Sequence, residues 1–143
     1  MLAEMVQTTK KHGNHERLAW DLFKLPTMGR TCPLNADKGH DKTVPVPELE
    51  WLFDQGSSGA IRVQTSDVVP TSDTEQPPQM QAANFYRDVR DKLGGDYVVT
   101  REHPKESVPE PLVGRIGRLG VRREKRIYPP TVVIPRDDAP RAG

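Results

Sequence analysis

Proline is the residue that most constrains this chain, because the 143-residue sequence contains 14 prolines. Each proline fixes φ and removes a backbone N–H donor, so a helix or a central strand cannot run through it. The prolines become dense from His103 onward, where the sequence reads as extended, broken segments. The pattern therefore predicts short regular elements that are separated by loops and extended segments.

The supply of apolar side chains is also small. Leu, Ile, Val and Phe make up 31 of the 143 residues, about 22%, which is just above the roughly 20% associated with intrinsic disorder. Ordering each residue costs roughly 1–2 kcal/mol of conformational entropy. We therefore expect a mostly irregular, extended fold with two or three short α-helices, little β-structure and no large independent core, so that a partner supplies the missing buried surface.

Two short helices are expected in the N-terminal segment, residues 1–56. Leu18, Leu22 and Leu25 recur at helical spacing within residues 14–25, and a proline follows them. A second apolar segment, residues 47–55, begins with a proline and is followed by a glycine, which suits both ends of a helix.

The clearest helical pattern covers residues 79–93, where four apolar residues recur at spacings of four, three and four: Ala82, Tyr86, Val89 and Leu93. Two glycines end this helix, and residues 96–100 have the composition of a strand. No second strong strand is evident nearby, so we expect this strand to pair with an edge elsewhere, for which a partner is one candidate.

The chain is accordingly divided into four parts. Residues 1–56 carry the first two helices, 57–78 form a polar linker with one β-like run at 60–63, 79–101 hold a helix and a short strand, and 102–143 form an extended, proline-rich basic strap.

A basic run covers residues 114–126, in which Gly-Arg-aliphatic occurs twice before further cations. From Arg115 to Arg126, six of twelve residues are cationic and one is acidic. Arginine pairs well with carboxylates and phosphates alike. The run is interpreted either as a clamp on an acidic protein surface or RNA backbone, or as a solvated basic tail.

The two tryptophans, Trp20 and Trp51, either pack together in a minimal core or act as anchors at an interface. The candidate partner-binding residues are therefore these two and the aromatic and basic residues of the C-terminal part: Trp20, Trp51, Arg115, Arg118, Arg122, Arg123, Arg126 and Tyr128.

No pattern in the sequence predicts a catalytic, cofactor or metal site. Motifs for nucleophilic catalysis, phosphate cradling and zinc proteolysis are absent, and the single Cys32 has no CxxC partner. No apolar run is long enough to span a membrane. We expect a non-enzymatic intracellular protein with no small-molecule substrate.

The straps 103–113 and 128–135 and the basic run 114–126 resemble, as a class, the small proline-rich microtubule inner proteins of ciliary doublets. The resemblance implies a structural subunit that staples neighbouring subunits, with tubulin as the favoured partner. It also implies a location in the cytoplasm, at the cytoskeleton of the cilium or flagellar axoneme.

Other assemblies remain as alternatives. The first is an accessory subunit of a ribosome, most readily a mitochondrial one, in which residues 115–126 would contact RNA. A net charge of +1 and the lack of interleaved aromatics count against it. An accessory subunit of a respiratory or viral assembly is the next alternative, and a self-contained domain of unknown activity is the last.

Overall fold

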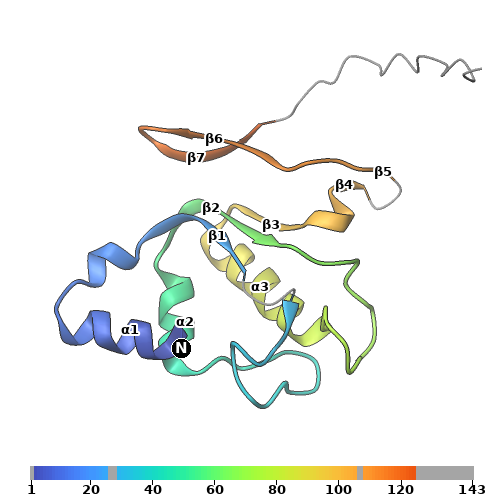
Figure 1. Cartoon of the computed structure of the whole chain (residues 1–143), viewed down its shortest axis with the longest axis horizontal. Coiled ribbons are helices and arrows are strands. Elements are labelled where there is room, and N and C mark those ends of the chain that lie inside the picture. Colours follow the sequence, from blue (N-terminus) through green and yellow to red (C-terminus); the bar gives the residue numbers. More distant parts are fainter. Residues whose placement is uncertain (1, 26–28, 106–107, 125–143) are drawn as a thin grey trace, which may run out of the picture.

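Three parallel strands form the centre of the structure, a computed structural model that describes residues 2–25, 29–105 and 108–124 (Figure 1). The strands are β1 (Trp20–Lys24), β2 (Gly56–Gln64) and β3 (Asp96–Val99), with β2 in the middle. Helix α2 (Pro47–Asp54) lies between β1 and β2 in sequence, and α3 (Met80–Leu93) between β2 and β3. The order is thus β–α–β–α–β, the arrangement that places parallel strands side by side.

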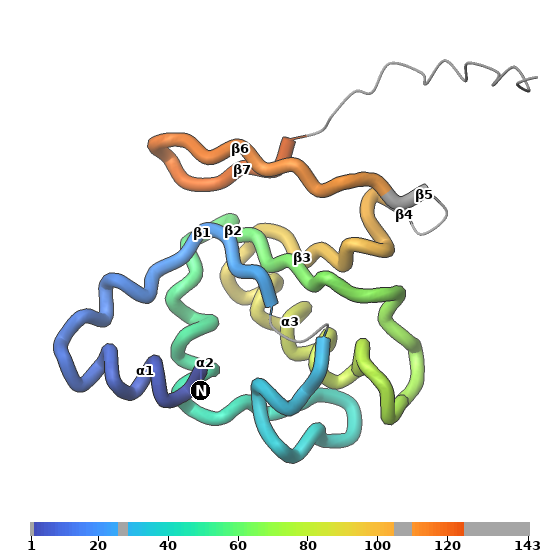
Figure 2. Tube along the Cα trace, in the orientation of Figure 1, coloured from blue at the N-terminus to red at the C-terminus, as the bar shows by residue number. Residues whose placement is uncertain are grey.

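The helices lie on one side of this sheet (Figure 1). An N-terminal helix, α1 (Leu2–Lys11), packs beside α2, where Gln7 Nε2 donates to Glu48 Oε1 at 2.7 Å. An antiparallel hairpin, β6 (Val113–Gly117) and β7 (Gly120–Glu124), lies on the opposite side of the sheet (Figures 1 and 2). The molecule therefore has a helical layer, a sheet and a separate hairpin.

This architecture corrects the predicted fold class. The described residues are not mostly irregular, with little β-structure and no large core; they form a compact α/β domain with three α-helices, a three-stranded parallel sheet, a hairpin and a buried aromatic core. Counting Leu, Ile, Val and Phe understated the buried surface, because Trp and Tyr also bury large apolar areas. The described residues therefore bury a core among themselves.

Aromatic rings fill the space between the sheet and the helices. Phe53 is 1% exposed and makes edge contacts with four other rings, whose centroids lie 5.3–6.3 Å away: Trp20, Phe23, Phe85 and Tyr86. Tyr97 extends the cluster from β3 through Tyr86 at 5.9 Å. Edge-to-face pairs of this kind stabilise a core in addition to the stability that comes from burying their apolar area.

The predicted helix at residues 14–25 is wrong. A short 3-10 helix, His15–Leu18, is followed by strand β1. Within β1 the side chains alternate, so that Phe23 contacts Phe53 in the core while Leu22 is 43% exposed. The leucine spacing fitted a helix, but the pairing of β1 with β2 decides the local structure.

The predictions for residues 47–55, 79–93 and 96–100 are confirmed to within a residue or so by α2, α3 and β3. The glycine pair after α3 is required by close packing. Gly95 has φ +90°, and a Cβ there would lie 2.3 Å from the carbonyl oxygen of Ala60. Only glycine allows this turn to pass so close to β2.

The strand that was missing from the sequence prediction is β2. It contains residues 57–64 of the expected linker, including the β-like run 60–63, and β3 pairs with it rather than with a partner. Near the start of the strand Ser57, Ser58 and Gly59 are exposed, whereas Ala60, Ile61 and Gln64 are buried. The polar beginning of the segment concealed a central strand.

A buried arginine, Arg62, also belongs to β2. Its side chain is covered completely, and its Nη1 donates to the carbonyl oxygens of Ala60 at 3.1 Å and Gly94 at 3.4 Å. The guanidinium lies 5.0 Å from the Trp20 ring centroid. Gly94 is the C-cap of α3, so Arg62 places positive charge at the negative end of that helix.

The first predicted strap, residues 103–113, contains paired strands as well as extended chain. Strand β4 (Pro104–Lys105) pairs with β5 (Val108–Pro109), and residues 110–112 lead into β6. The second strap, 128–135, lies outside the described residues. Within the residues that are described, no helix is long and apolar enough to cross a membrane.

Candidate docking surface

The basic run forms a projecting structure that we call the arginine hairpin, residues 113–124. Its strands are joined by the two-residue turn Arg118-Leu119, with Gly117 and Gly120 paired on either side. Gly120 has φ +98°, a conformation that suits glycine, and a Cβ there would lie 3.0 Å from Cγ of Asp21. Gly120 therefore lets the turn approach β1 closely.

One face of the arginine hairpin concentrates positive charge. Arg115 and Arg122 are directly opposite each other across the two strands, and Glu124 is the one acid of the hairpin. Arg115 Nη2 lies 3.1 Å from Glu124 Oε1, yet the Arg115 side chain is still 77% exposed. Like charges that are directly opposite in a sheet are destabilising, so this face favours an external anion.

The turn adds exposed apolar side chains. Leu119 is 86% exposed and Ile116 is 84% exposed, and Arg118 beside them is also exposed. Exposing large aliphatic side chains to water is unfavourable in free energy. Here two of them lie next to arginines. A surface of this composition is suited to contact with another protein, since arginine is enriched at interfaces and aliphatic groups fill their cores.

Arg123 has a different role, because it attaches the hairpin to the sheet. Its Nη2 lies 2.8 Å from Nδ1 of His103, and its Nη1 lies 3.5 Å from Oδ2 of Asp96, the first residue of β3. Partial burial and the nearby Arg123 lower the pKa of His103. A neutral imidazole can accept the arginine hydrogen bond, whereas an imidazolium would repel it.

The two tryptophans lie apart from this surface. Trp20 Nε1 donates to the carbonyl oxygen of Leu52 at 2.9 Å, and its ring packs on the aromatic core. Trp51 is partly buried at the edge of the same core, with Lys10 Nζ 3.9 Å from its ring centroid and His15 edge-on. The structure thus brings together Arg115, Arg118, Arg122 and Arg123, but neither tryptophan. Arg126 and Tyr128 lie outside the described residues.

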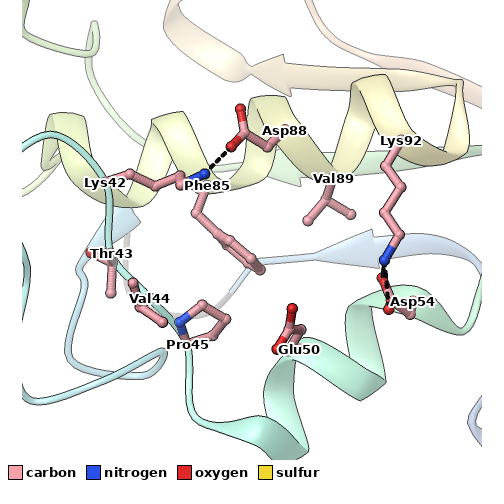
Figure 3. A pocket seen from close by; sticks show the side chains of 10 residues that line it. All are labelled: Lys42, Thr43, Val44, Pro45, Glu50, Asp54, Phe85, Asp88, Val89 and Lys92. Atoms are coloured by element: carbon pink, nitrogen blue, oxygen red, sulfur yellow. Dashed lines mark hydrogen bonds and ion pairs between the residues drawn. The ribbon is translucent and has the colours of Figure 1, made fainter.

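A second candidate is the groove between α2 and α3, with a volume of about 240 Å³ (Figure 3). Phe85 and Val89 form its apolar wall, and charged residues surround it. Lys92 Nζ lies 2.7 Å from Asp54 Oδ1, and Lys42 pairs with Asp88. The two aspartates are thus already neutralised by lysines, and the lining contains no His, Cys or Ser to act with them as a base or nucleophile.

Across residues 2–25, 29–105 and 108–124, no group of three or more His, Cys, Asp or Glu side chains is arranged to hold a metal ion. His40 and Asp41 are in contact at 2.8 Å, but both side chains are almost fully exposed. The arginine hairpin is therefore the feature with the most distinctive chemistry.

Comparison with known proteins gives no further assignment. No protein-family model, no curated protein and no solved structure matches this chain.

Sequence reasoning identified the hairpin arginines but missed the residues that give them their geometry. Asp21, Asp96 and His103 approach the hairpin only because the sheet folds beneath it. Ile116 and Leu119 were visible as aliphatics within the basic run. The two-residue spacing between Gly117 and Gly120 was the available signal that both would lie at a turn.

Proposed function

We propose that this protein is a non-enzymatic binding subunit of a larger assembly, which docks its arginine hairpin onto an acidic surface of a neighbouring protein. The observation that carries the proposal is the cross-strand pair Arg115 and Arg122, two like charges that face each other while the one acid of the hairpin, Glu124, pairs with Arg115. Carboxylates of a partner would supply the missing negative charge.

A protein partner is favoured over a nucleic acid by the exposed aliphatic groups. Ile116 and Leu119 would be buried against a protein, which adds apolar contact to the charge pairing. The hairpin has no aromatic side chain on which an unpaired base could stack. The chain as a whole carries a net charge of only +1, which is low for a protein that binds RNA broadly.

Within this proposal, tubulin is the partner suggested by the resemblance to microtubule inner proteins, and the ciliary axoneme is the corresponding location. RNA of a mitochondrial ribosome is the competing partner, and a respiratory or viral assembly is a further one. The folded domain changes how such a subunit would work. A self-supporting domain that presents one arm fits attachment at a defined point better than wrapping along a lattice.

The test compares two triple variants that remove the same charge. Arg115→Gln, Arg118→Gln and Arg122→Gln change the hairpin, whereas Arg17→Gln, Arg30→Gln and Arg101→Gln change exposed arginines elsewhere. Tagged proteins are recovered from cells with and without nuclease, and partners are identified by mass spectrometry. We expect the hairpin variant alone to lose its partner, irrespective of nuclease. Equal recovery with both variants would refute the proposal, and loss of the partner on nuclease treatment would favour RNA.

A further inference from the structure

The arginine hairpin has one strand edge that faces the domain and one that does not. Strand β7 lies next to β1 and β2, whereas β6 lies on the far side of β7 (Figures 1 and 2). In the part of the chain that the structure describes, β6 has β7 as its single strand neighbour. The outer edge of β6 is therefore available to another strand.

The register identifies the backbone groups on that edge. Gly117 and Gly120 flank a two-residue turn, so they form a hydrogen-bonded pair. Bonded and non-bonded pairs alternate along an antiparallel ladder. Arg115 therefore bonds inward to β7, whereas Gly114 and Ile116 point their N–H and C=O groups outward. No backbone hydrogen bond from another described segment engages those two residues.

The side chains beside this edge alternate in chemistry. Arg115 lies on one face of the hairpin with Arg122. Ile116 lies on the other face with Val121 and with Arg123, whose guanidinium contacts Asp96 and His103. Gly114 and Gly117 have no side chain, and a Cβ at Gly117 would meet no atom within 4 Å. A strand added here would meet positive charge on one face, aliphatic surface on the other, and open space beside the glycines.

We propose that an extended acidic segment of the partner adds to the outer edge of β6 as a third strand. Its acidic side chains lie beside Arg115, with Arg122 on the same face one strand further away, and the alternate side chains, aliphatic, lie beside Ile116. This inference rests on the proposed function and names the form in which the acidic partner is recognised. Backbone pairing supplies affinity and the alternating faces supply specificity, as in other cases of strand addition. A nucleic acid has no peptide backbone with which to pair in this way.

The experiment uses the full-length protein and fluorescein-labelled synthetic peptides in which Glu alternates with Val. One control peptide has the same composition with Glu and Val in separate blocks. A second has the alternating sequence with alternate backbone nitrogens methylated, which removes donors but keeps every charge. We expect the alternating peptide to bind, and the methylated peptide to bind about tenfold more weakly or worse, because each lost hydrogen bond weakens binding several-fold.

Amide hydrogen exchange of the protein distinguishes backbone pairing from charge pairing, because charge pairing alone would not protect particular backbone amides. Binding of the alternating peptide should slow exchange at the outward amides of Gly114 and Ile116 and leave that of Arg115, which already bonds to β7, little changed. The variant Arg115→Gln with Arg122→Gln should weaken binding of both alternating and block peptides, while Arg17→Gln with Arg30→Gln should not.

The outcomes separate this inference from the proposed function. If the alternating, block and methylated peptides bind equally and all depend on Arg115 and Arg122, an acidic docking surface stands and strand addition is overturned. If no peptide binds but the hairpin arginines are still required for recovery of a protein partner from cells, strand addition is again overturned alone. If RNA binds in place of the peptides and recovery from cells is lost on nuclease treatment, both are overturned.

Discussion

Two arginine environments in this protein differ in almost every respect. Arg62 is fully buried in the central strand, where carbonyl oxygens and an aromatic ring surround it. Arg115 and Arg122 stand exposed on a hairpin, opposite each other. The first is fixed by the fold and cannot reach a partner. The second pair is exposed to one, so in the proposed function the domain core supplies stability and the arginine hairpin supplies binding.

The largest expected difference between the two regions comes from removing one apolar side chain in each. Phe53→Ala should destabilise the protein by about 3–5 kcal/mol, because it empties the centre of the aromatic cluster. Leu119→Ala, at a residue that is 86% exposed, should change stability by less than about 0.5 kcal/mol. Urea unfolding followed by circular dichroism measures both. A Leu119→Ala loss similar to that of Phe53→Ala would mean that the hairpin is part of the core.

The next effect concerns two glycines with similar φ angles. Gly95→Ala should cost about 2–4 kcal/mol, since the new Cβ would clash with Ala60 in β2. Gly59 also has a positive φ, +82°, but a Cβ there meets no atom within 4 Å. Gly59→Ala should therefore cost only the conformational strain, about 1–2 kcal/mol. Equal losses in a chemical denaturation series would show that the close approach to β2 is unimportant.

A smaller effect is expected at the buried arginine. Nε and Nη2 of Arg62 have no hydrogen-bond partner among the described residues, and burial lowers the pKa of the guanidinium. Replacing a poorly compensated buried charge by an apolar side chain of similar length is often close to neutral, so Arg62→Met should change stability by about 1 kcal/mol in either direction. A loss of several times that size in thermal unfolding would indicate that the guanidinium is well paired.

The smallest effect is a pH dependence at the base of the arginine hairpin. The charged groups near His103 are Arg123, Asp96 and Glu110, and the pKa of His103 is lowered, first by burial and then by Arg123. The attached state therefore favours the neutral imidazole. The stability that this contact gives to the attached hairpin is fully present above the ordinary histidine pKa of about 6.5. It is lost as the pH falls below that value.

Amide exchange in β7 measures this attachment as a function of pH. After correction for the intrinsic dependence of exchange on pH, protection of β7 should fall as the pH drops below the ordinary histidine pKa of about 6.5, because protonation of His103 opposes its contact with Arg123. The variant His103→Gln keeps a polar side chain that does not titrate, and should flatten the profile. A profile that is unchanged by this substitution would assign any pH dependence to another group.

The difference between the two regions also explains which features of the structure could be predicted from the sequence. The prolines were interpreted as breaking the fold, yet they mark the spaces between its elements. Residues 1–25, 48–69, 79–103 and 112–128 contain no proline. Every strand of the sheet, α1, α3 and the arginine hairpin fall inside these ranges, and α2 begins at Pro47. The density of prolines was less informative than their positions.

Local sequence patterns were sufficient to predict an element whose structure does not depend on pairing with a distant segment. The helix at residues 79–93 could be predicted because its apolar residues keep one period and glycines end it. Strand β1 could not, because Leu18, Leu22 and Leu25 fit a helix until β2 pairs with the segment. The same holds for the proposed docking surface. The charges of Arg115 and Arg122 were evident from the sequence, but their position opposite each other depends on the turn at residues 118–119.

The topology of the two sheets has a consequence for the order in which they form. Strand β2 pairs on both sides with strands that are distant in sequence, so the parallel sheet requires the closure of two long loops, each of which contains a helix. The arginine hairpin closes across two residues, and its pairing is entirely local. Loop-closure entropy slows non-local pairing much more than local pairing. We therefore expect the parallel sheet to set the refolding rate, while the hairpin strands pair early and acquire their place against the sheet last.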